Sequence, residues 1–304
     1  MFRTAVRFAI CLALSLVFST LFSLPASAQH FQQVKGTLVS VAAGRNEVFG
    51  IGPSGLPWRY NATSKSFAKV TGATGLAQVA VGGGTVSQLD EVWAVAASGK
   101  VFRFNFTTKS FDQITGVLSQ ITVGPGYEDN CHPYEVWGVN SVQSIFRYNY
   151  CTSEWEQAVG SLTVVATGGG DVWGINVNGQ VFHFLGNTSF HQVTGLYNTP
   201  TQLAVGVNDV WVIDNTAQVY RYDPSTGQFN AINDLFLLQI AAGGDGVWAT
   251  WDGTLARFDP EDNGGSGEFI AVSLDGSCSD VAVGSGAGVF AVNSSHQIFT
   301  LVRP

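Results

Sequence analysis

Hydrophobic and polar positions alternate in one phrase that returns seven times along the chain. Each copy has a Val followed by an aromatic residue and a tight turn, and five copies continue with an aromatic–basic–aromatic run. In the second copy the alternation marks four short segments, 67–70, 78–82, 92–96 and 100–104. Such short period-two segments predict strands. The recurring pairs are Val48-Phe49, Val92-Trp93, Val136-Trp137, Val172-Trp173, Val210-Trp211, Val247-Trp248 and Val289-Phe290.

Consecutive units begin 35 to 44 residues apart. A repeat of this period, made only of short strands, indicates a β-propeller. One four-stranded sheet cannot bury both of its faces, so neighbouring units must stack. The chain starts with the pattern of an outermost strand at 31–34 and ends after a third strand at 298–301. We therefore predict an all-β fold, a seven-bladed β-propeller of four-stranded antiparallel blades, closed by the N-terminal strand completing the last blade.

Turn residues predict the register of the hairpin between the third and fourth segments of a unit. Ser98-Gly99 is a two-residue turn signal, and counting outward from it places Trp93 opposite Phe104 and Ala94 opposite Arg103. Trp93 would then share one face with the aromatics, and the small residue would leave room for the guanidinium to reach the adjacent blade. The sixth copy is one residue shorter, so its register or its turn must differ.

The first 28 residues have the features of a secretory signal. Two Arg precede an apolar run, 8–24, and a small-residue site ends at Ala28, which predicts cleavage there. The alternative is an uncleaved anchor, since the apolar run could almost span a bilayer. We expect a signal peptide at 1–28, one propeller domain at 29–304, and a secreted or periplasmic protein with no transmembrane segment after cleavage.

The net charge of the chain bears on its partners, and its cysteine count bears on disulfide formation. The formal net charge is −8, and an acidic surface disfavours nucleic acid. Cys11 would leave with the signal, and an odd number of Cys then remains, so at least one thiol is unpaired in the monomer. Cys131 and Cys151 lie in loops predicted on the same face of the third unit. They are predicted to form a disulfide, the alternative being two thiols that merely lie near each other.

Two phrases of the third and fourth units resemble the tectonin repeat. The first phrase consists of residues 136–140 followed by 145–148, and the second consists of residues 172–176 followed by 181–184. Residues 111–116 and 120–124, which precede the first phrase, match the other half of that repeat. Tectonins are β-propellers, and their secreted members are lectins that bind glycans or bacterial lipopolysaccharide. The resemblance therefore implies a carbohydrate-binding protein with glycans or bacterial surface saccharides as partners. Well-known tectonin lectins have six blades, whereas seven units are counted here.

A basic residue recurs at one strand position, and an acid often precedes the Val-aromatic pair. One interpretation is structural pairing between blades, with each guanidinium against an aromatic ring of its neighbour. The other is a ring of donors for sugar hydroxyls or anionic sugars. The basic candidates are Arg59, Arg103, Arg147, His183, Arg221 and Arg257, with Thr300 in the seventh copy; the acids are Glu47, Glu91, Glu135, Asp171 and Asp209.

Further candidates lie in turns and loops. Trp251 flanks the Asp252-Gly253 turn and would serve as a sugar platform if exposed, whereas the Val-Trp tryptophans are predicted to be inter-blade core. Tyr127, His132 and Tyr134 crowd the longest loop of the third unit, where binding residues are common. That loop is otherwise interpreted as a solvated insertion.

Enzyme chemistry finds little support in the sequence. The His residues lack metal-site spacing, and no nucleophile elbow or phosphate loop is recognisable,. We assign no catalytic residue, no metal and no cofactor. The leading hypothesis is a metal-independent lectin with several equivalent blade sites. The alternatives are a protein-interaction scaffold and a propeller lyase or glycoside hydrolase, because paired carboxylates are not excluded.

Overall fold

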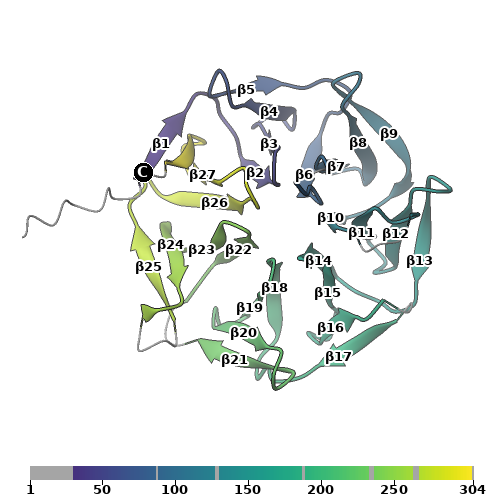
Figure 1. Cartoon of the computed structure of the whole chain (residues 1–304), viewed down its shortest axis with the longest axis vertical. Helices are drawn as coiled ribbons and strands as arrows, with labels where there is room; N and C mark the ends of the chain where they lie inside the picture. The colour runs from purple at the N-terminus through teal and green to yellow at the C-terminus, as the bar shows by residue number, and fades with distance from the viewer. Residues whose placement is uncertain are drawn as a thin grey trace, which may run out of the picture.

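The computed structural model of the protein describes residues 30–86, 88–126, 130–186, 189–232, 236–262 and 267–302. The expected signal peptide, 1–28, lies outside the described residues. Within these ranges, 28 strands form seven four-stranded antiparallel sheets. Figure 1 shows the sheets arranged radially around a central opening, with successive blades following the chain around the ring. The predicted all-β, seven-bladed propeller is confirmed.

Strands run outward from the axis in sequence order within each of the first three blades. Blade one consists of β2 (Ser40–Ala43), β3 (Val48–Ile51), β4 (Pro57–Asn61) and β5 (Ser66–Lys69). Blade two consists of β6 (Leu76–Gly82), β7 (Glu91–Ala96), β8 (Lys100–Asn105) and β9 (Ser110–Val117). Blade three consists of β10 (Gln120–Pro125), β11 (Tyr134–Val139), β12 (Ile145–Asn149) and β13 (Glu154–Ala158).

The next three blades repeat the same order. Blade four consists of β14 (Val164–Gly168), β15 (Asp171–Ile175), β16 (Val181–Phe184) and β17 (Phe190–Val193). Blade five consists of β18 (Pro200–Val205), β19 (Val210–Asp214), β20 (Val219–Asp223) and β21 (Gln228–Ile232). Blade six consists of β22 (Gln239–Gly243), β23 (Gly246–Trp251), β24 (Thr254–Asp259) and β25 (Glu268–Val272).

Blade seven is assembled from both ends of the described chain. It contains β26 (Cys278–Val283), β27 (Val289–Asn293) and β28 (Ile298–Val302), and its outermost strand is β1 (His30–Val34). β1 pairs antiparallel with β28 from His30 opposite Val302 to Val34 opposite Ile298. In Figure 1 the purple β1 lies beside the yellow strands of this blade. The predicted closure is therefore confirmed, and it pairs an edge that would otherwise be open.

The Val-aromatic pairs form the contacts between blades. Five tryptophans of these pairs, together with Phe49 and Phe290, rank among the largest fully buried side chains of the described part. Trp93 of blade two, for example, meets Tyr148 of blade three edge to face, with ring centroids 4.7 Å apart. Offset and edge-on ring pairs of this kind add about 0.5–1.5 kcal/mol beyond area burial. The expected role of these tryptophans as inter-blade core is confirmed.

The predicted hairpin register is wrong by one residue. Trp93 pairs with Arg103, not with Phe104, and Ala94 pairs with Phe102. The reason is the loop, which has three residues: Gly99 N–H donates to the Ala96 carbonyl, and Gly99 adopts φ +84°. A three-residue hairpin of this kind ends in a positive-φ residue. Trp93 and Phe102 therefore face opposite neighbours of blade two.

The shorter sixth copy keeps this register by changing its turn. Trp248 pairs with Arg257, as Trp93 pairs with Arg103 in blade two. Its turn is a true two-residue one, in which both Asp252 (φ 46°) and Gly253 (φ 76°) have positive φ, the geometry of a type I′ hairpin. Deleting one loop residue therefore leaves the strand pairing intact.

The small residues beside the aromatic pairs serve a different purpose from the one expected. Because of the corrected register, Gly138 lies opposite Phe146, not opposite Arg147. A Cβ on Gly138 would come within 2.4 Å of the Leu118 side chain. Gly50 and Gly174 meet leucines in the same way. The small residue thus accommodates a leucine of the inter-blade linker, and no guanidinium.

Candidate functional site

Five blades carry a carboxylate–base pair at the start of their second strand. In blade two, Glu91 lies two residues before Trp93, so both side chains project from the same face of β7, and Arg103 lies directly opposite Trp93. Arg103 donates from Nε and Nη2 to the two Glu91 oxygens at 2.8 and 2.7 Å. The equivalent pairs are Arg59–Glu47, Arg147–Glu135, His183–Asp171 and Arg221–Asp209. Each of these ion pairs lies within one blade.

Contact with the next blade is made by the flat face of the guanidinium. Arg103 Cζ lies 5.0 Å from the ring centre of Tyr150 in blade three. Arg59 lies 5.4 Å from the Phe104 ring of blade two, and Arg221 lies 5.7 Å from the Phe258 ring of blade six. The expected stacking on an aromatic of the adjacent blade is confirmed. In blades one, two and five the carboxylate therefore orients a guanidinium that contacts the next blade, whereas Arg147 lies 5.5 Å from the Trp137 ring of its own blade and His183 stacks on Trp173 of its own blade.

The length of the acid decides whether the indole N–H is satisfied. Glu91 accepts a hydrogen bond from Trp93 Nε1 at 3.0 Å, and Glu135 accepts one from Trp137 Nε1 at 2.5 Å. Blades four and five have Asp at this position, and the Nε1 atoms of Trp173 and Trp211 are buried without a partner among the described residues. The missing methylene of Asp therefore leaves a buried donor unsatisfied.

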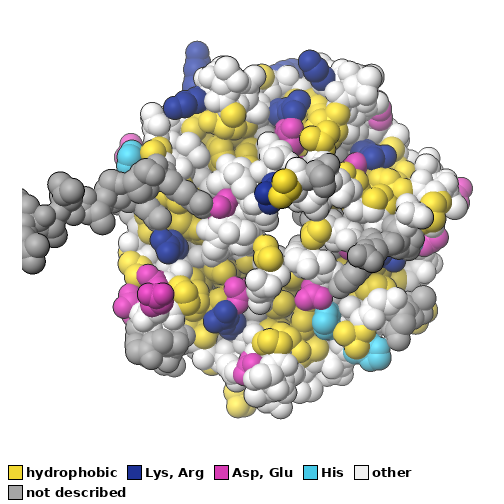
Figure 2. Space-filling model, in the orientation of Figure 1, with side chains coloured by type: hydrophobic (Ala, Val, Ile, Leu, Met, Phe, Trp, Pro, Cys, Tyr) yellow, Lys and Arg dark blue, Asp and Glu magenta, His cyan; other side chains and the backbone are white. Residues whose placement is uncertain are grey.

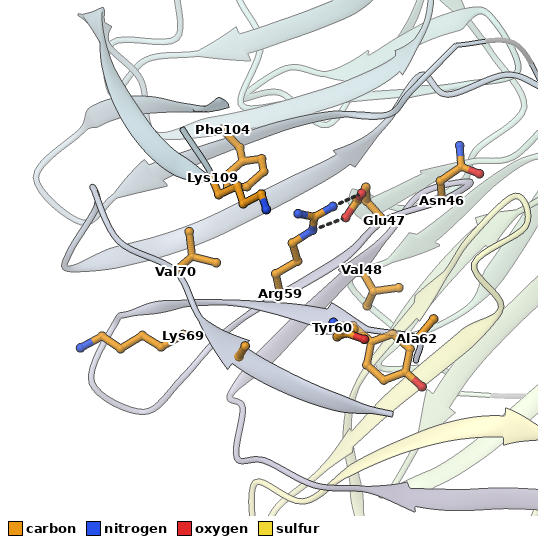
Figure 3. Close-up of a pocket in the computed structure, with 12 residues that line it drawn as sticks. Asn46, Glu47, Val48, Arg59, Tyr60, Ala62, Lys69, Val70, Phe104 and Lys109 are labelled. Carbon is orange, nitrogen blue, oxygen red and sulfur yellow. Dashed lines mark hydrogen bonds and ion pairs between the residues drawn. The ribbon is translucent and has the colours of Figure 1, made fainter. Parts of the chain in front are cut away.

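The groove between blades one and two is a cavity of about 470 Å³. Figure 3 shows the Arg59 guanidinium joined to Glu47 by two hydrogen bonds, with Phe104 beyond it. Tyr60 and Lys109 also line the cavity. Burial raises the pKa of the Tyr60 hydroxyl, which therefore stays protonated at neutral pH. The groove presents hydrogen-bond donors and one carboxylate, while the Phe104 ring at its base is buried.

A smaller cavity, about 300 Å³, is lined by residues of blade two, among them Glu91, Arg103 and Asp112. Cys131 and Cys151 are bonded, as predicted. Tyr150 N–H donates to the Cys131 carbonyl at 2.8 Å, which fixes the aromatic ring under Arg103. Burial raises the pKa of Tyr150 far above its ordinary value. The disulfide therefore anchors the loop next to Tyr150, the aromatic partner of Arg103 in blade three.

A third cavity, about 430 Å³, spans blades five to seven. It is lined by Arg221 and Asp209 from blade five, by Trp248 and Arg257 from blade six, and by Leu301 from blade seven. Around the ring, Figure 2 shows Lys or Arg side chains beside Asp or Glu side chains at several blades, with hydrophobic patches between them. Arg59, Arg103, Arg221 and Arg257 thus line cavities, while Arg147 pairs with the most deeply buried of the acids.

The other predicted residues lie apart from these grooves. Tyr127 lies outside the described residues. His132 is buried, with Nε2 3.5 Å from a Glu156 oxygen, and the Tyr134 hydroxyl donates to the Leu89 carbonyl at 2.9 Å. Trp251 is half-buried against the core between blades five and six, at the strand end opposite the grooves. Of the three, Tyr134 lies near a basic residue, because its ring is 5.8 Å from that of Tyr150, which lies beside Arg103.

The central opening is a separate cavity of about 410 Å³, lined largely by the glycine-rich ends of the innermost strands. A Cβ on Gly82 would come within 2.4 Å of the Val123 carbonyl oxygen, so close approach of neighbouring blades requires glycine there. Asp90 accepts hydrogen bonds from three backbone N–H groups of blade one, those of Arg45, Asn46 and Glu47. The carboxylate of Asp90 therefore ties two blades together.

The described ranges contain neither a clustered metal site nor a membrane-spanning helix. These residues contain no group of three or more His, Cys, Asp or Glu side chains placed to hold a metal ion. They also contain no helix with the length and hydrophobicity that crossing a bilayer requires.

Comparison with known proteins places the repeat in a family. A model of the Tectonin domain matches residues 19–195 and 161–303, two segments that overlap. No curated protein matches the sequence significantly.

Solved structures share the fold at low sequence identity. YCF48 from Cyanidioschyzon merolae is 14% identical with a TM-score of 0.64, covering 90% of this chain and 98% of that one. A structure of YCF48 bound to D1 peptide is 13% identical with a TM-score of 0.63, covering 91% and 97%. Streptogramin B lyase is 12% identical with a TM-score of 0.65, covering 90% and 97%. At these identities the likeness shows the propeller fold alone.

Proposed function

Because this chain belongs to the tectonin family, we propose that it is an exported, non-catalytic lectin that binds glycans in the grooves between its blades. Family membership supports the carbohydrate class, since secreted tectonins are lectins. The N-terminal signal pattern supports export to a secreted or periplasmic location. The proposed partners are glycans or bacterial surface saccharides.

The observation that carries the proposal is the oriented guanidinium in each groove. In the groove between blades one and two, Glu47 holds Arg59 Nε and Nη2. A guanidinium has five N–H donors, so donors on Arg59 remain for sugar hydroxyls. Glu47 is an acceptor in the same cavity. Clefts of about 300 Å³ or more, lined by aromatic surface with a few placed polar groups, are typical of small-ligand sites.

Repetition around the ring adds to the affinity expected for a surface. A single shallow groove would bind a sugar weakly. Several equivalent grooves on one rigid disc engage a surface that displays many copies of the same sugar, and linked binding of this kind exceeds single-site affinity by orders of magnitude. The proposal therefore favours polymeric or membrane-displayed glycans over free monosaccharides.

A glycan array followed by calorimetric titration of the strongest hit tests this proposal. We expect more than one site per chain, and one fewer site in each of the single variants Arg59→Lys, Arg103→Lys and Arg221→Lys, because Lys cannot present the planar fork. The matched control is Arg45→Lys, since Arg45 lines the central opening and lies outside the grooves. Absence of any array signal at high protein concentration, or a stoichiometry that no groove variant changes, would refute groove binding.

A protein-interaction scaffold is the second candidate, and one observation favours it. Large apolar side chains are exposed at turns and linkers of the strand ends opposite the grooves, namely Val142, Val159, Val177, Tyr197 and Phe236. YCF48, which shares the fold, has been seen with a bound peptide. Binding of a protein that survives all three groove variants would support this candidate. Turnover of a polysaccharide, abolished by one carboxylate substitution, would instead support a propeller lyase or hydrolase.

A further inference from the structure

The charged residues of the chain are distributed unevenly around the ring. Residues 35–109, which form most of blades one and two, hold eight Lys or Arg and three Asp or Glu. Residues 110–304 hold four Lys or Arg and 19 Asp or Glu. Figure 2 shows dark blue Lys and Arg side chains over the top of the disc, where Figure 1 places blades one and two. These two blades therefore form a basic sector in a chain whose formal net charge is −8.

Two cations of this sector meet in the groove between blades one and two. Arg59 of blade one and Lys109 of blade two line the same cavity of about 470 Å³. In Figure 3 the ammonium end of Lys109 points toward the Arg59 guanidinium. Among the described residues that line the cavity, Glu47 is the one acid and Lys69 is a third cation. The groove therefore carries an excess of positive charge.

Both cations keep donors that the protein does not use. Glu47 accepts from Nε and Nη2 of Arg59, whereas Nη1 is neither buried nor bonded to an acceptor within the described part of the chain. Lys109 is exposed, and its ammonium makes no ion pair with any described residue. Two like charges thus share one cavity with no anion between them.

The turn that carries Lys109 is held by hydrogen bonds. The Asn105 side chain accepts from the N–H groups of Thr107 and Thr108 at 2.9 and 3.2 Å. The Lys109 N–H donates to the Asn105 carbonyl at 2.8 Å, and Lys109 adopts φ +55°. The ammonium therefore extends from a backbone of fixed conformation at the rim of the groove.

The same turn position holds other residues elsewhere in the ring. The equivalent positive-φ residues are Lys65 in blade one, Ser153 in blade three and Gly227 in blade five. By the repeat of the ring, Lys65 corresponds with Thr300 of blade seven, and Ser153 with Arg103 of blade two. Neither combination brings two cations together. Of these described turns, the one in blade two places a lysine against the basic residue of the preceding blade.

We propose that the groove between blades one and two binds an oxyanion group, which is a phosphate, sulfate or carboxylate. The oxyanion accepts hydrogen bonds from Arg59 Nη1 and from the Lys109 ammonium, while Glu47 holds the other side of the guanidinium. Guanidinium and ammonium groups are the usual partners of such oxyanions. The acidic remainder of the ring disfavours a long polyanion such as nucleic acid. Resting on the proposed function, the oxyanion is therefore a substituent of an acidic saccharide.

Calorimetric titration of the full chain compares glucose 6-phosphate with glucose, and inorganic phosphate tests the oxyanion without a sugar ring. We expect glucose 6-phosphate to bind about tenfold more tightly than glucose, and its binding to weaken as salt is raised. Lys109→Gln should weaken that binding by about tenfold, because a charge-assisted hydrogen bond is lost. The matched control is Lys65→Gln, since Lys65 is equally exposed at the same turn position and does not line the cavity.

A second variant reverses the charge. Lys109→Glu should abolish binding of glucose 6-phosphate while leaving neutral glycans in the other grooves unaffected. Gln143 already has positive φ in this protein, so Lys109→Gln is compatible with the turn. Circular dichroism checks that both variants fold, and if Lys109→Glu does not, Lys109→Gln decides.

The outcomes separate this inference from the proposed function. Binding of glucose 6-phosphate no tighter than that of glucose, or equal losses in Lys109→Gln and Lys65→Gln, overturns the oxyanion site even if neutral glycans bind elsewhere. Lys109-dependent binding of glucose 6-phosphate and inorganic phosphate, with no signal on a glycan array, leaves the oxyanion site standing and removes the lectin proposal. Lys109-dependent binding of a thymidine oligonucleotide, without binding of glucose 6-phosphate, overturns the assignment to an acidic saccharide.

Discussion

Replacing the carboxylate of each ion pair by its amide should destabilise the propeller in proportion to the burial of that carboxylate. The same substitution is available in several blades, which makes it a matched series. The Glu135 side chain is 1% exposed and its partner Arg147 is 18% exposed, whereas Asp209 and Arg221 are 29% and 39% exposed. The surrounding scaffold is otherwise equivalent.

The expected loss in the free energy of unfolding depends on how deeply the remaining arginine and indole are buried. Glu135→Gln removes the charge that faces a buried guanidinium and removes the carboxylate that accepts from Trp137 Nε1. Breaking a buried pair by removing one partner costs about 3–5 kcal/mol. Asp209→Asn acts on a pair that solvent screens, so about 0–1 kcal/mol is expected. Glu91→Gln, whose carboxylate is 9% exposed beside a more exposed arginine, should fall between the two.

Urea unfolding measures the series. Tryptophan fluorescence reports blade separation, and equal slopes across the variants would show that midpoint differences reflect stability. The expected order of loss is Glu135→Gln, then Glu91→Gln, then Asp209→Asn. Equal losses in all three, or the largest loss at Asp209, would refute the view that desolvation of the pair sets its contribution.

Asp209→Glu should stabilise the protein by about 1 kcal/mol, because the longer side chain reaches the unsatisfied Nε1 of Trp211 as Glu91 reaches its indole,; an unchanged urea midpoint would contradict this. Burial raises the pKa of the Asp280 carboxyl above its ordinary value, so the wild type loses stability as pH rises from about 4 through that pKa. Asp280→Asn should therefore gain more over the wild type at pH 7 than at pH 4, and an equal gain at both would count against a neutral carboxyl. Burial also raises the pKa of Cys278 to about 12, so iodoacetamide at pH 8 should label it only in urea, and fast labelling of the folded protein would show an accessible thiolate.

The seven-bladed ring could be predicted because each blade is encoded by one local sequence repeat. Each unit specifies its own strands, and the phase of the first and last units specifies how the ring closes, as the pairing of β1 with β28 shows. The disulfide was also predictable, since strand alternation places Cys131 and Cys151 in loops at the same strand ends. The remaining cysteine, Cys278, is a free, buried thiol, which the odd count left open.

Hairpin register was not predictable from the turn residues. Ser98-Gly99 fits a two-residue turn and also the last two positions of a three-residue turn, because Gly satisfies positive φ in both. Equivalent positions in other blades hold Gln143, Ala217 and His296, all with positive φ, so the glycine is not what fixes the loop. One residue of error moves a side chain to the other face of the strand. For this reason the sequence suggested that Arg103 lay opposite Ala94.

The same one-residue error in hairpin register explains why the arrangement of the candidate site could not be predicted from the sequence. With Arg103 opposite Trp93, the guanidinium, the indole and the Glu91 carboxylate lie on one face of the blade. The identity of the acid in each blade then determines which of these hydrogen bonds can form. Asp in place of Glu leaves a buried indole N–H unsatisfied in blades four and five. Such a donor costs about 1–3 kcal/mol, which the burial of apolar side chains in the same inter-blade core must offset. In blade six the acid position is Gly246, and the Trp248 indole donates to the Asp245 backbone carbonyl at 3.4 Å instead.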